Sequence, residues 1–212
     1  TEYYDYTVDN ILNYNGQFGK HTVSATLLYG ASERKYDTTK ADAQNFSRLT
    51  LGYNDLSLGT NQYTTSGAWN EALLYQMGRV NYKFDDRYLL TATVRRDGYS
   101  GFAKNNKFAI FPSVALAWNI NQEKFFNVKW VDQLKLRAGW GISGNQTSRY
   151  KSLAKVTMSS AYVFGDGGQT EIGQKVSTMA NSDLKWEKTE GLNFGLDFAV
   201  LNSRINGTLD VY

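Results

Sequence analysis

The 212-residue sequence contains no cysteine, one proline (Pro112) and one histidine (His21). Without cysteine it has neither a disulfide framework nor a thiolate metal site. A lone histidine offers no cluster for metal binding or general-base catalysis, so we expect no metal, no cofactor and no catalytic residue. Apolar runs of about 18 residues, which a transmembrane helix needs, are also absent. The scarcity of proline suits long paired strands, because proline lacks the N–H that a strand donates to its neighbour.

The net charge and the aromatic content further limit the class of protein to which the sequence can belong. A net charge of +3, with basic residues spread along the chain, does not indicate a nucleic-acid partner. Aromatic residues make up 15% of the chain and include 15 tyrosines, and such residues favour strands. The sequence starts at Thr1 without a leader pattern and ends on an unfinished strand pattern at Tyr212. We therefore expect a segment of a longer protein.

Apolar and polar residues alternate along much of the chain. The alternation is regular at 80–84 and 88–94, on either side of Asp85 and Asp86, and predicts a hairpin. Comparable stretches lie at 6–14, 21–29, 108–120, 134–142, 186–200 and 205–211. Asn10 interrupts the pattern once. The sequence therefore predicts an all-β, antiparallel fold with about eight strands.

Strand length and loop length favour a transmembrane β-barrel over a soluble β-sandwich. The alternating stretches run for about 10 to 14 residues, whereas soluble strands average about 5–6 and a membrane-crossing strand needs about 9–11. The connections near Gly16, Asp85 and Asn202 are short, whereas 30–70, 97–107 and 144–185 are long. Short periplasmic turns opposite long extracellular loops are typical of outer-membrane barrels. We therefore assign residues 1–212 to one barrel domain.

The polar face of these strands carries charges that a barrel would place in its lumen. The residues expected to face the lumen are Arg79, Arg95, Lys135, Arg137, Glu187 and Asp197. Structural pairing of these carboxylates with the cations is the better interpretation, although paired carboxylates also occur in hydrolases. Aromatic residues fall near both strand ends and predict two interfacial girdles. They are Tyr14, Phe84, Tyr88, Trp118 and Phe198 at the turn ends, and Phe108, Trp140 and Trp186 at the loop ends.

Four stretches, taken in order, resemble the SusC/RagA family of TonB-dependent outer-membrane transporters. They are GRVNYKFDDRYLLTATVRRDG (78–98), FPSVALAW (111–118), LKLRAGWGISGNQ (134–146), and NSDLKWEK (181–188) with LNFGLDF (192–198). The first 77 residues resemble the family only in general style. Two positions depart from its usual pattern, with Tyr99 in place of serine and Ser182 in place of proline.

The resemblance implies a larger barrel, of 22 strands, that is filled by a plug domain and covered by a SusD-like surface lipoprotein. Energy would come from the TonB complex. We expect the plug and the signal peptide to lie outside this chain. A position in the middle to late third of the wall follows from the strand count. The implied partners also include outer-membrane lipid and a glycan or oligopeptide substrate, and the implied location is the cell outer membrane.

Aromatic residues in the long loops are the candidate substrate contacts, because exposed loop aromatics often bind ligands. They are Tyr53, Tyr63, Trp69, Tyr150, Tyr162 and Phe164. Packing within the loops or against a lid subunit is the alternative explanation. Asp166-Gly167-Gly168 lacks the alternating oxygen ligands of a calcium loop.

The sequence therefore predicts a non-enzymatic barrel segment for active import of a large nutrient. The alternatives are a passive porin or adhesin barrel, which an upstream plug would exclude, and a soluble β-rich carbohydrate-binding protein, which would dissolve without detergent.

Overall fold

The computed structural model describes residues 1–48, 50–147, 149–164 and 169–212, with side chains for all of these except 159–164 and 169–172. The strands are β1 (Glu2–Phe18), β2 (His21–Phe46), β3 (Gly59–Phe84), β4 (Tyr88–Tyr99), β5 (Phe108–Asn119), β6 (Val131–Asn145), β7 (Lys155–Phe164), β8 (Gln169–Thr178), β9 (Glu187–Val200) and β10 (Ile205–Val211). Three short 3-10 helices accompany them: η1 (Gly52–Asn54), η2 (Leu56–Leu58) and η3 (Ile120–Gln122). No helix in this part of the chain is long and apolar enough to cross a membrane.

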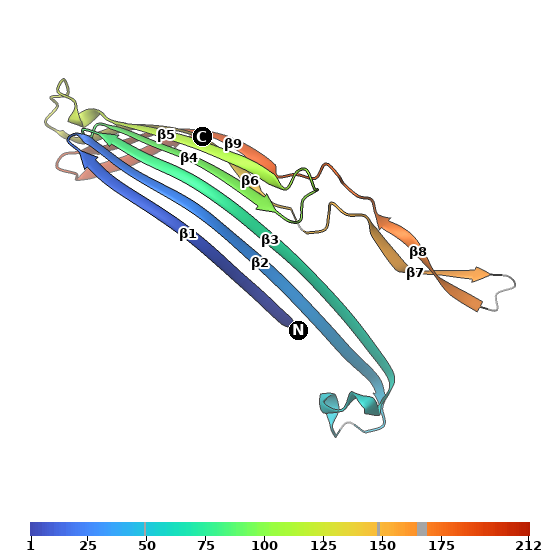
Figure 1. Ribbon diagram of the computed structural model, residues 1–212. Coiled ribbons are helices and arrows are strands. Elements are labelled where there is room, and N and C mark those ends of the chain that lie inside the picture. The colour runs from blue at the N-terminus through green and yellow to red at the C-terminus, as the bar shows by residue number, and fades with distance from the viewer. Residues whose placement is uncertain (49, 148, 165–168) are drawn as a thin grey trace.

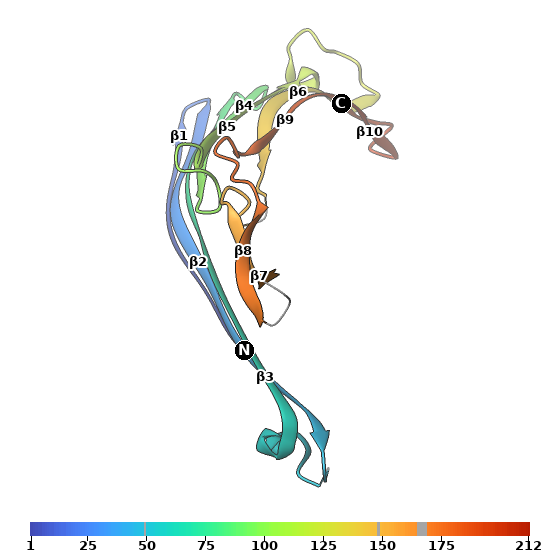
Figure 2. The ribbon, with the colours of Figure 1, turned by 90° about the vertical axis from the view of Figure 1, so that its right-hand side faces the viewer.

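Eight strands form one antiparallel sheet in the order β1-β2-β3-β4-β5-β6-β9-β10. The sheet is strongly curved (Figure 2), with one convex and one concave side. The strands β1 and β10 stand at its two ends and do not pair with each other within the described residues. The described sheet is thus open, and the prediction of an all-β, antiparallel fold with about eight strands is confirmed.

Tight turns join the strands at one end of the sheet (Figure 1). Asp85 and Asp86 adopt positive φ angles of 50° and 54°, as the turn of a β-hairpin requires. Phe18 pairs with His21, so the first turn consists of Gly19 and Lys20 alone. The alternation pattern predicted this turn at 15–20, whereas β1 continues to Phe18. Gly19 has a φ of 60°, a conformation that glycine adopts without steric cost.

The segment 30–70 is not a structureless loop, and this part of the sequence prediction is wrong. The strands β2 and β3 each contain 26 residues and pair without interruption from His21 and Phe84 to Phe46 and Gly59. They extend beyond their neighbours as a two-stranded ribbon (Figure 1), and only 47–58 lie outside it. The segment 144–185 likewise contains the hairpin of β7 and β8, which forms a separate sheet. The connection expected at 97–107 is shortened to 100–107.

Few side chains of the described residues are buried, because no second layer of these residues covers the sheet along most of its length. The one cluster of buried aromatic rings consists, among the described residues, of Tyr99, Phe102, Phe111 and Trp186. Phe102 lies 5.1 Å from Trp186 and 5.4 Å from Tyr99, measured between ring centroids. A soluble β-sandwich would bury one whole face of the sheet against a second sheet. Among the described residues, packing of this kind is concentrated in the aromatic cluster.

Trp186 occupies a different place from the one that the sequence indicated. It was expected in an interfacial girdle, whereas it is only 8% exposed and packs against Phe102 and Phe111. Its indole N–H donates to the carbonyl of Lys107 at 2.9 Å. The physical reason is that the segment before β9 folds against the 100–107 connection. A period-two pattern within one strand does not reveal this long-range contact.

Candidate functional site

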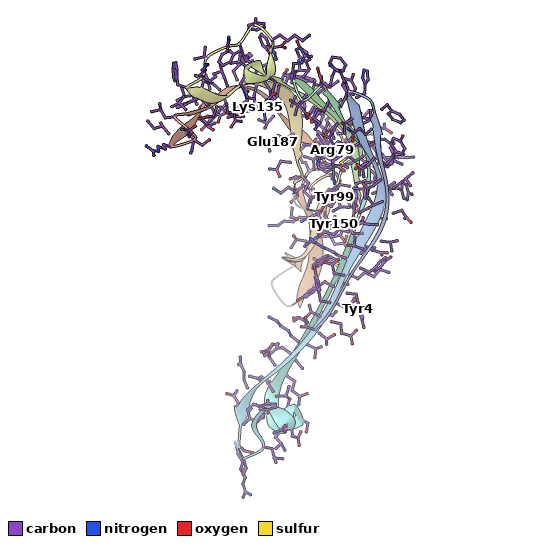
Figure 3. All side chains as sticks on the ribbon, turned by 90° about the vertical axis from the view of Figure 1, so that its left-hand side faces the viewer. Tyr4, Arg79, Tyr99, Lys135, Tyr150 and Glu187 are labelled. Carbon is purple, nitrogen blue, oxygen red and sulfur yellow. The ribbon has the colours of Figure 1, made fainter. Side chains whose placement is uncertain are left out.

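The convex face of the sheet is apolar. Tyr4 lies on this side, opposite Tyr99 and Tyr150 on the concave side (Figure 3). Strand register places one row of side chains across seven strands on the face of Tyr4: Val23, Tyr82, Leu90, Leu116, Ala138, Phe194 and Val211. Large apolar residues on this face are widely exposed, for example Leu116 at 54% and Leu209 at 63%. A continuous apolar surface of this extent is unusual for a protein surface in water.

A row of aromatic rings closes the apolar face at the turn end. Ring centroids are 4.8 Å apart for His21 and Phe84, 6.4 Å for Phe84 and Tyr88, and 6.5 Å for Tyr88 and Trp118. Rings with a polar edge are suited to the interface between hydrocarbon and water. This row matches the turn-end girdle that was expected around Phe84, Tyr88 and Trp118.

Glu123 holds the polar edges of two of these rings. It lies just after η3, is 8% exposed, and accepts hydrogen bonds from the Tyr88 hydroxyl at 2.6 Å and the Trp118 indole at 3.0 Å. Arg87 donates to its other oxygen at 3.0 Å. These hydrogen bonds, from Tyr88 and Trp118 first, hold the pKa of the Glu123 carboxyl below its usual value although burial opposes them. The connection between β5 and β6 therefore anchors the ring row.

The concave face is predominantly polar. Arg79 on β3 donates to the Thr93 hydroxyl on β4 at 3.1 Å, and Arg95 pairs with Asp97 within β4 at 2.8 Å. The Tyr75 hydroxyl donates to Asp9 at 2.6 Å. One row is apolar instead and consists of Ile11, Leu28 and Met77. These cross-strand pairs tie together the first four strands of the sheet.

Arg137 connects three strands on the concave face. It donates two hydrogen bonds to Asp197, at 2.8 and 3.0 Å, and one to Asp210 at 3.0 Å. Gly195 pairs with both Arg137 and Asp210, and a Cβ atom at Gly195 would stand 2.6 Å from the guanidinium carbon. The missing side chain at Gly195 therefore allows the guanidinium to lie across β9 and reach β10.

A second polar cluster lies further toward the loop end, beyond the apolar band. The Trp69 ring stacks on Tyr36, with centroids 5.4 Å apart, and Arg149 lies over it with its guanidinium carbon 3.5 Å from the centroid. Arg149 also donates to Glu71 at 3.2 Å. Tyr99 donates to the same carboxylate at 2.8 Å. Together, the cation–π contact and the charged hydrogen bonds hold the segment after β6 against β3.

The protonation of this cluster follows from its surroundings. Burial alone would raise the pKa of the Glu71 carboxyl, but hydrogen bonds from Tyr99 and Arg149 and the nearby guanidinium charges hold it below its usual value. Burial, together with the bond to Glu71, raises the pKa of Tyr99 to about 12. At neutral pH the cluster therefore combines an ionised carboxylate with a neutral phenol. Tyr99, where the family pattern has serine, contributes both to this cluster and to the buried aromatic core.

The loop aromatics proposed as substrate contacts fall into two groups. Tyr53 is 87% exposed in η1, and Tyr63 is 56% exposed on β3. Trp69 and Tyr150 are instead part of the internal packing, since the Tyr150 hydroxyl accepts from the Asn70 N–H and donates to the Asn70 carbonyl. The side chains of Tyr162 and Phe164, and the segment 166–168, lie outside the described residues.

Register places the residues that were expected in the lumen on the concave side of the sheet: Arg79, Arg95, Lys135, Arg137, Glu187 and Asp197. Glu187 begins β9 and accepts a long hydrogen bond of 3.4 Å from Asn145. His21 bonds to the Tyr82 hydroxyl at 2.7 Å and takes part in the ring row. Among the described residues there is no group of three or more metal-ligating side chains.

The sequence reasoning missed four residues of this second polar cluster, the loop-end cluster: Arg34, which forms an ion pair with Glu71 at 3.7 Å, Tyr36, Glu71 and Arg149. The first three lie on the extended part of β2 and β3, which the sequence treated as loop. Continuing the period-two pattern through 30–46 and 59–72 would have placed Tyr36 opposite Trp69.

Comparison with known proteins gives a consistent family. The family model for the TonB dependent receptor-like β-barrel matches residues 1–212, including the first 77, where the sequence motifs were not specific. The TonB-dependent receptor P3 of Formosa agariphila is 37% identical over 207 residues, which are 96% of this chain and 20% of that protein. The TonB-dependent receptor SusC of Bacteroides thetaiotaomicron is 41% identical over 151 residues, which are 70% of this chain and 15% of that protein.

Solved structures agree with the sequence comparison. A structure of the RagAB peptide transporter matches with a TM-score of 0.83 and 28% identity, over 98% of this chain and 23% of that one. The chain thus spans about a fifth of the length of the relatives it matches. The chain belongs to the TonB-dependent receptor-like β-barrel family, as a SusC/RagA-type section of the barrel wall.

Proposed function

We propose that this chain forms part of the wall of an outer-membrane transporter that imports a large nutrient with energy from the TonB complex. The observation that carries the proposal is the opposite character of the two faces of the curved sheet. The convex side presents an apolar band to its surroundings, and the concave side presents cross-strand ion pairs and hydrogen bonds. A barrel built from such strands meets lipid outside and encloses a hydrated lumen.

The height of the apolar band supports a membrane-crossing role. On β4 it extends from Tyr88, in the ring row, to Arg96, which stands in a polar row. Eight residue steps of about 3.4 Å give about 27 Å along the strand. At a strand tilt of about 40° this corresponds to about 21 Å along the membrane normal, close to the band of about 25 Å in outer-membrane barrels.

The proposed cargo is a glycan or an oligopeptide. The relatives include a SusC protein and a RagAB peptide transporter, and the name of the latter supports a peptide. The proposed partners are a SusD-like surface lipoprotein on the loop side and the TonB complex, through parts of the protein outside this chain. The lumen-facing charges are Arg79, Arg95, Lys135, Arg137, Glu187 and Asp197. They are assigned to wall stability and to contact with a plug.

Tyr53 and Tyr63 are the proposed cargo contacts of this chain. Both rings are exposed, Tyr63 on the far part of β3 and Tyr53 in the connection between β2 and β3. Trp69 and Tyr150 receive a different role, because their polar and aromatic surfaces are already engaged with Arg149 and Asn70. We assign them to holding the loop in place. Tyr162 and Phe164 remain candidates for cargo contact from the sequence alone.

The test is uptake by cells that carry the full-length gene or its deletion, with labelled oligopeptides and labelled glycans as separate probes. We expect uptake of one probe class that requires both this gene and an intact TonB complex. Uptake that persists without TonB would instead support a passive porin. A full-length protein that stays in solution without detergent would overturn the membrane assignment. The variants Tyr53→Ala and Trp69→Ala separate cargo contact from loop packing. Tyr53→Ala should lower cargo affinity without changing the protection of the loop from proteolysis, whereas Trp69→Ala should reduce that protection.

A further inference from the structure

A polar row crosses the convex face between apolar rows, with Val8, Ala31 and Leu74 next to it on the loop side. One row across β1 to β4 consists of Asn10, Tyr29, Gln76 and Arg96. The next row toward the turns consists of Leu12, Leu27, Gly78 and Val94. These rows are about 7 Å apart, since neighbouring residues on one face of a strand are two steps of about 3.4 Å apart. This surface therefore presents polar and apolar side chains close enough together to bind the two ends of one amphiphilic molecule.

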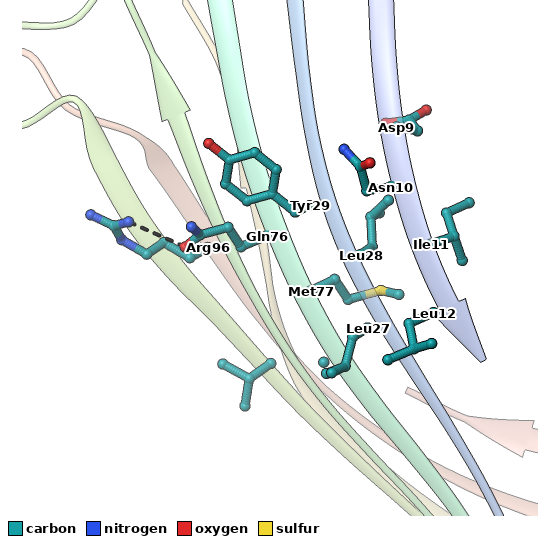
Figure 4. A pocket seen from close by; sticks show the side chains of 12 residues that line it. Asp9, Asn10, Ile11, Leu12, Leu27, Leu28, Tyr29, Gln76, Met77 and Arg96 are labelled. Atoms are coloured by element: carbon teal, nitrogen blue, oxygen red, sulfur yellow. Dashed lines mark hydrogen bonds between the residues drawn. The ribbon is translucent and has the colours of Figure 1, made fainter. Parts of the chain in front are cut away.

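A groove of about 810 Å³ lies between and across these two rows (Figure 4). Gly78 forms its floor, because the place of a Cβ atom there has only Leu27 Cδ2 nearby, at 3.6 Å. Leu27 and Val94 flank the glycine and are 57% and 55% exposed. The groove therefore has apolar sides and a floor without a side chain, a shape that fits an alkyl chain lying along the sheet.

Arg96 stands at the polar end of the groove with its charge available. Its guanidinium donates to the Gln76 side-chain oxygen at 3.3 Å and lies 4.1 Å from the centroid of the Phe108 ring. Neither partner is charged. Within the described part of the chain no carboxylate lies within ion-pair distance of Arg96. The cation is thus oriented by neutral neighbours and exposed toward the surroundings of the convex face.

We propose that this groove binds one membrane lipid with a phosphate-bearing headgroup, its phosphate at Arg96 and one acyl chain over Gly78. The inference rests on the proposed function, in which the convex face meets the bilayer. Charge complementarity selects an anionic headgroup, because a cation at the membrane interface attracts anionic lipid. The guanidinium presents several N–H donors to phosphate oxygens in a fixed geometry. Gln76 and Tyr29 add neutral polar groups on the same row.

The experiment measures lipid retention by the full-length protein. Native mass spectrometry of detergent-purified protein titrated with phosphatidylglycerol, phosphatidylcholine or inorganic phosphate gives the number and affinity of bound molecules. We expect phosphatidylglycerol to bind at least tenfold more tightly than phosphatidylcholine, and inorganic phosphate alone not to bind. Arg96→Gln should remove the preference for the anionic lipid. Gly78→Leu should fill the groove and weaken both lipids.

Two variants control for charge and volume elsewhere in the sheet. Arg204→Gln removes an exposed cation from the turn between β9 and β10, and Gly191→Leu adds the same volume at a glycine with open space around it. Both should leave lipid binding unchanged. Equal lipid binding by Arg96→Gln and the unaltered protein overturns the inference, as does tight binding of free phosphate or occupation of the face by a second copy of the chain. Those results leave membrane insertion and uptake intact, whereas failure of the proposed function abolishes insertion or TonB-dependent uptake in the unaltered protein.

Discussion

An arginine introduced at the middle of the convex band provides a quantitative test of which face meets lipid. Ala92 lies midway between Tyr88 and Arg96 on β4 and pairs with Val80 and Val114. By the estimate above it stands about 10 Å from either edge of the hydrocarbon layer, which is the most costly depth for a charge. Ala92→Arg should therefore destabilise the inserted barrel by about 2–4 kcal/mol.

The neighbouring positions provide a depth series and a matched control. Leu90 faces the same way but is one row nearer the ring row, so Leu90→Arg should cost less, about 1–3 kcal/mol. Thr91 faces the concave side, where its hydroxyl donates to Asn81 at 2.8 Å. Thr91→Arg loses that one exposed hydrogen bond and places its charge in a polar space, at a cost of about 0.5–1.5 kcal/mol.

The assay is denaturant unfolding of the full-length barrel from lipid vesicles, followed by tryptophan fluorescence and by heat-modifiable migration on a gel. A loss of about 2–4 kcal/mol lowers the ratio of folded to unfolded protein about 30- to 700-fold. The expected order of destabilisation is Ala92→Arg, then Leu90→Arg, then Thr91→Arg. Equal tolerance of arginine at positions 91 and 92 would refute the assignment of convex and concave faces.

Three further predictions concern the loop end. Glu71→Gln should release the segment that contains Arg149 and increase its proteolysis. Because the pKa of Glu71 is lowered in the folded protein, its stabilisation is present at neutral pH and is lost as the pH falls through that lowered value. Protease sensitivity that is independent of both the variant and the pH would contradict this. Phe102→Ala should cost about 3–5 kcal/mol in the local stability of the buried aromatic cluster, read from hydrogen exchange. An unchanged hydrogen-exchange pattern would show that the buried aromatic cluster does not hold the loops. Tyr150→Phe removes the hydroxyl bonded to Asn70 and should raise exchange of that amide about 2- to 13-fold, from a loss of about 0.5–1.5 kcal/mol. A protected Asn70 amide in this variant would rule out that role.

The eight-stranded sheet was predictable because one face of most strands is apolar and the other polar. The hairpin around Asp85 and Asp86 is the clearest example, with strand ends at Phe84 and Tyr88 as the pattern indicated. Asn10 interrupts the alternation of β1, yet the strand continues past it. It stands in the polar row with Tyr29, between Val8 and Leu12 on the same face, so the interruption reflects one polar row across the sheet and not the end of the strand.

The continuation of β2 beyond Gly30 was not predictable from the same signal. Both of its faces are polar, as in Ser32, Glu33, Arg34 and Lys35, so hydropathy does not alternate although the backbone does. The loop-end cluster was not predicted from the sequence for a related reason. Arg149 meets Glu71 across 78 residues of sequence. No local pattern encodes a contact of that range.

The path of Arg137 over Gly195 bears on how the last strands find their partners during barrel assembly. A strand that slips by two residues keeps its apolar side toward lipid, so hydropathy does not distinguish the correct alignment from the slipped one. A slip of this kind would place Asn193 or Asp197 beneath the guanidinium instead of Gly195, and the link to Asp210 would be lost. Gly195 and the three charged groups Arg137, Asp197 and Asp210 thus fix the strand register. They select one alignment among several that expose the same apolar face.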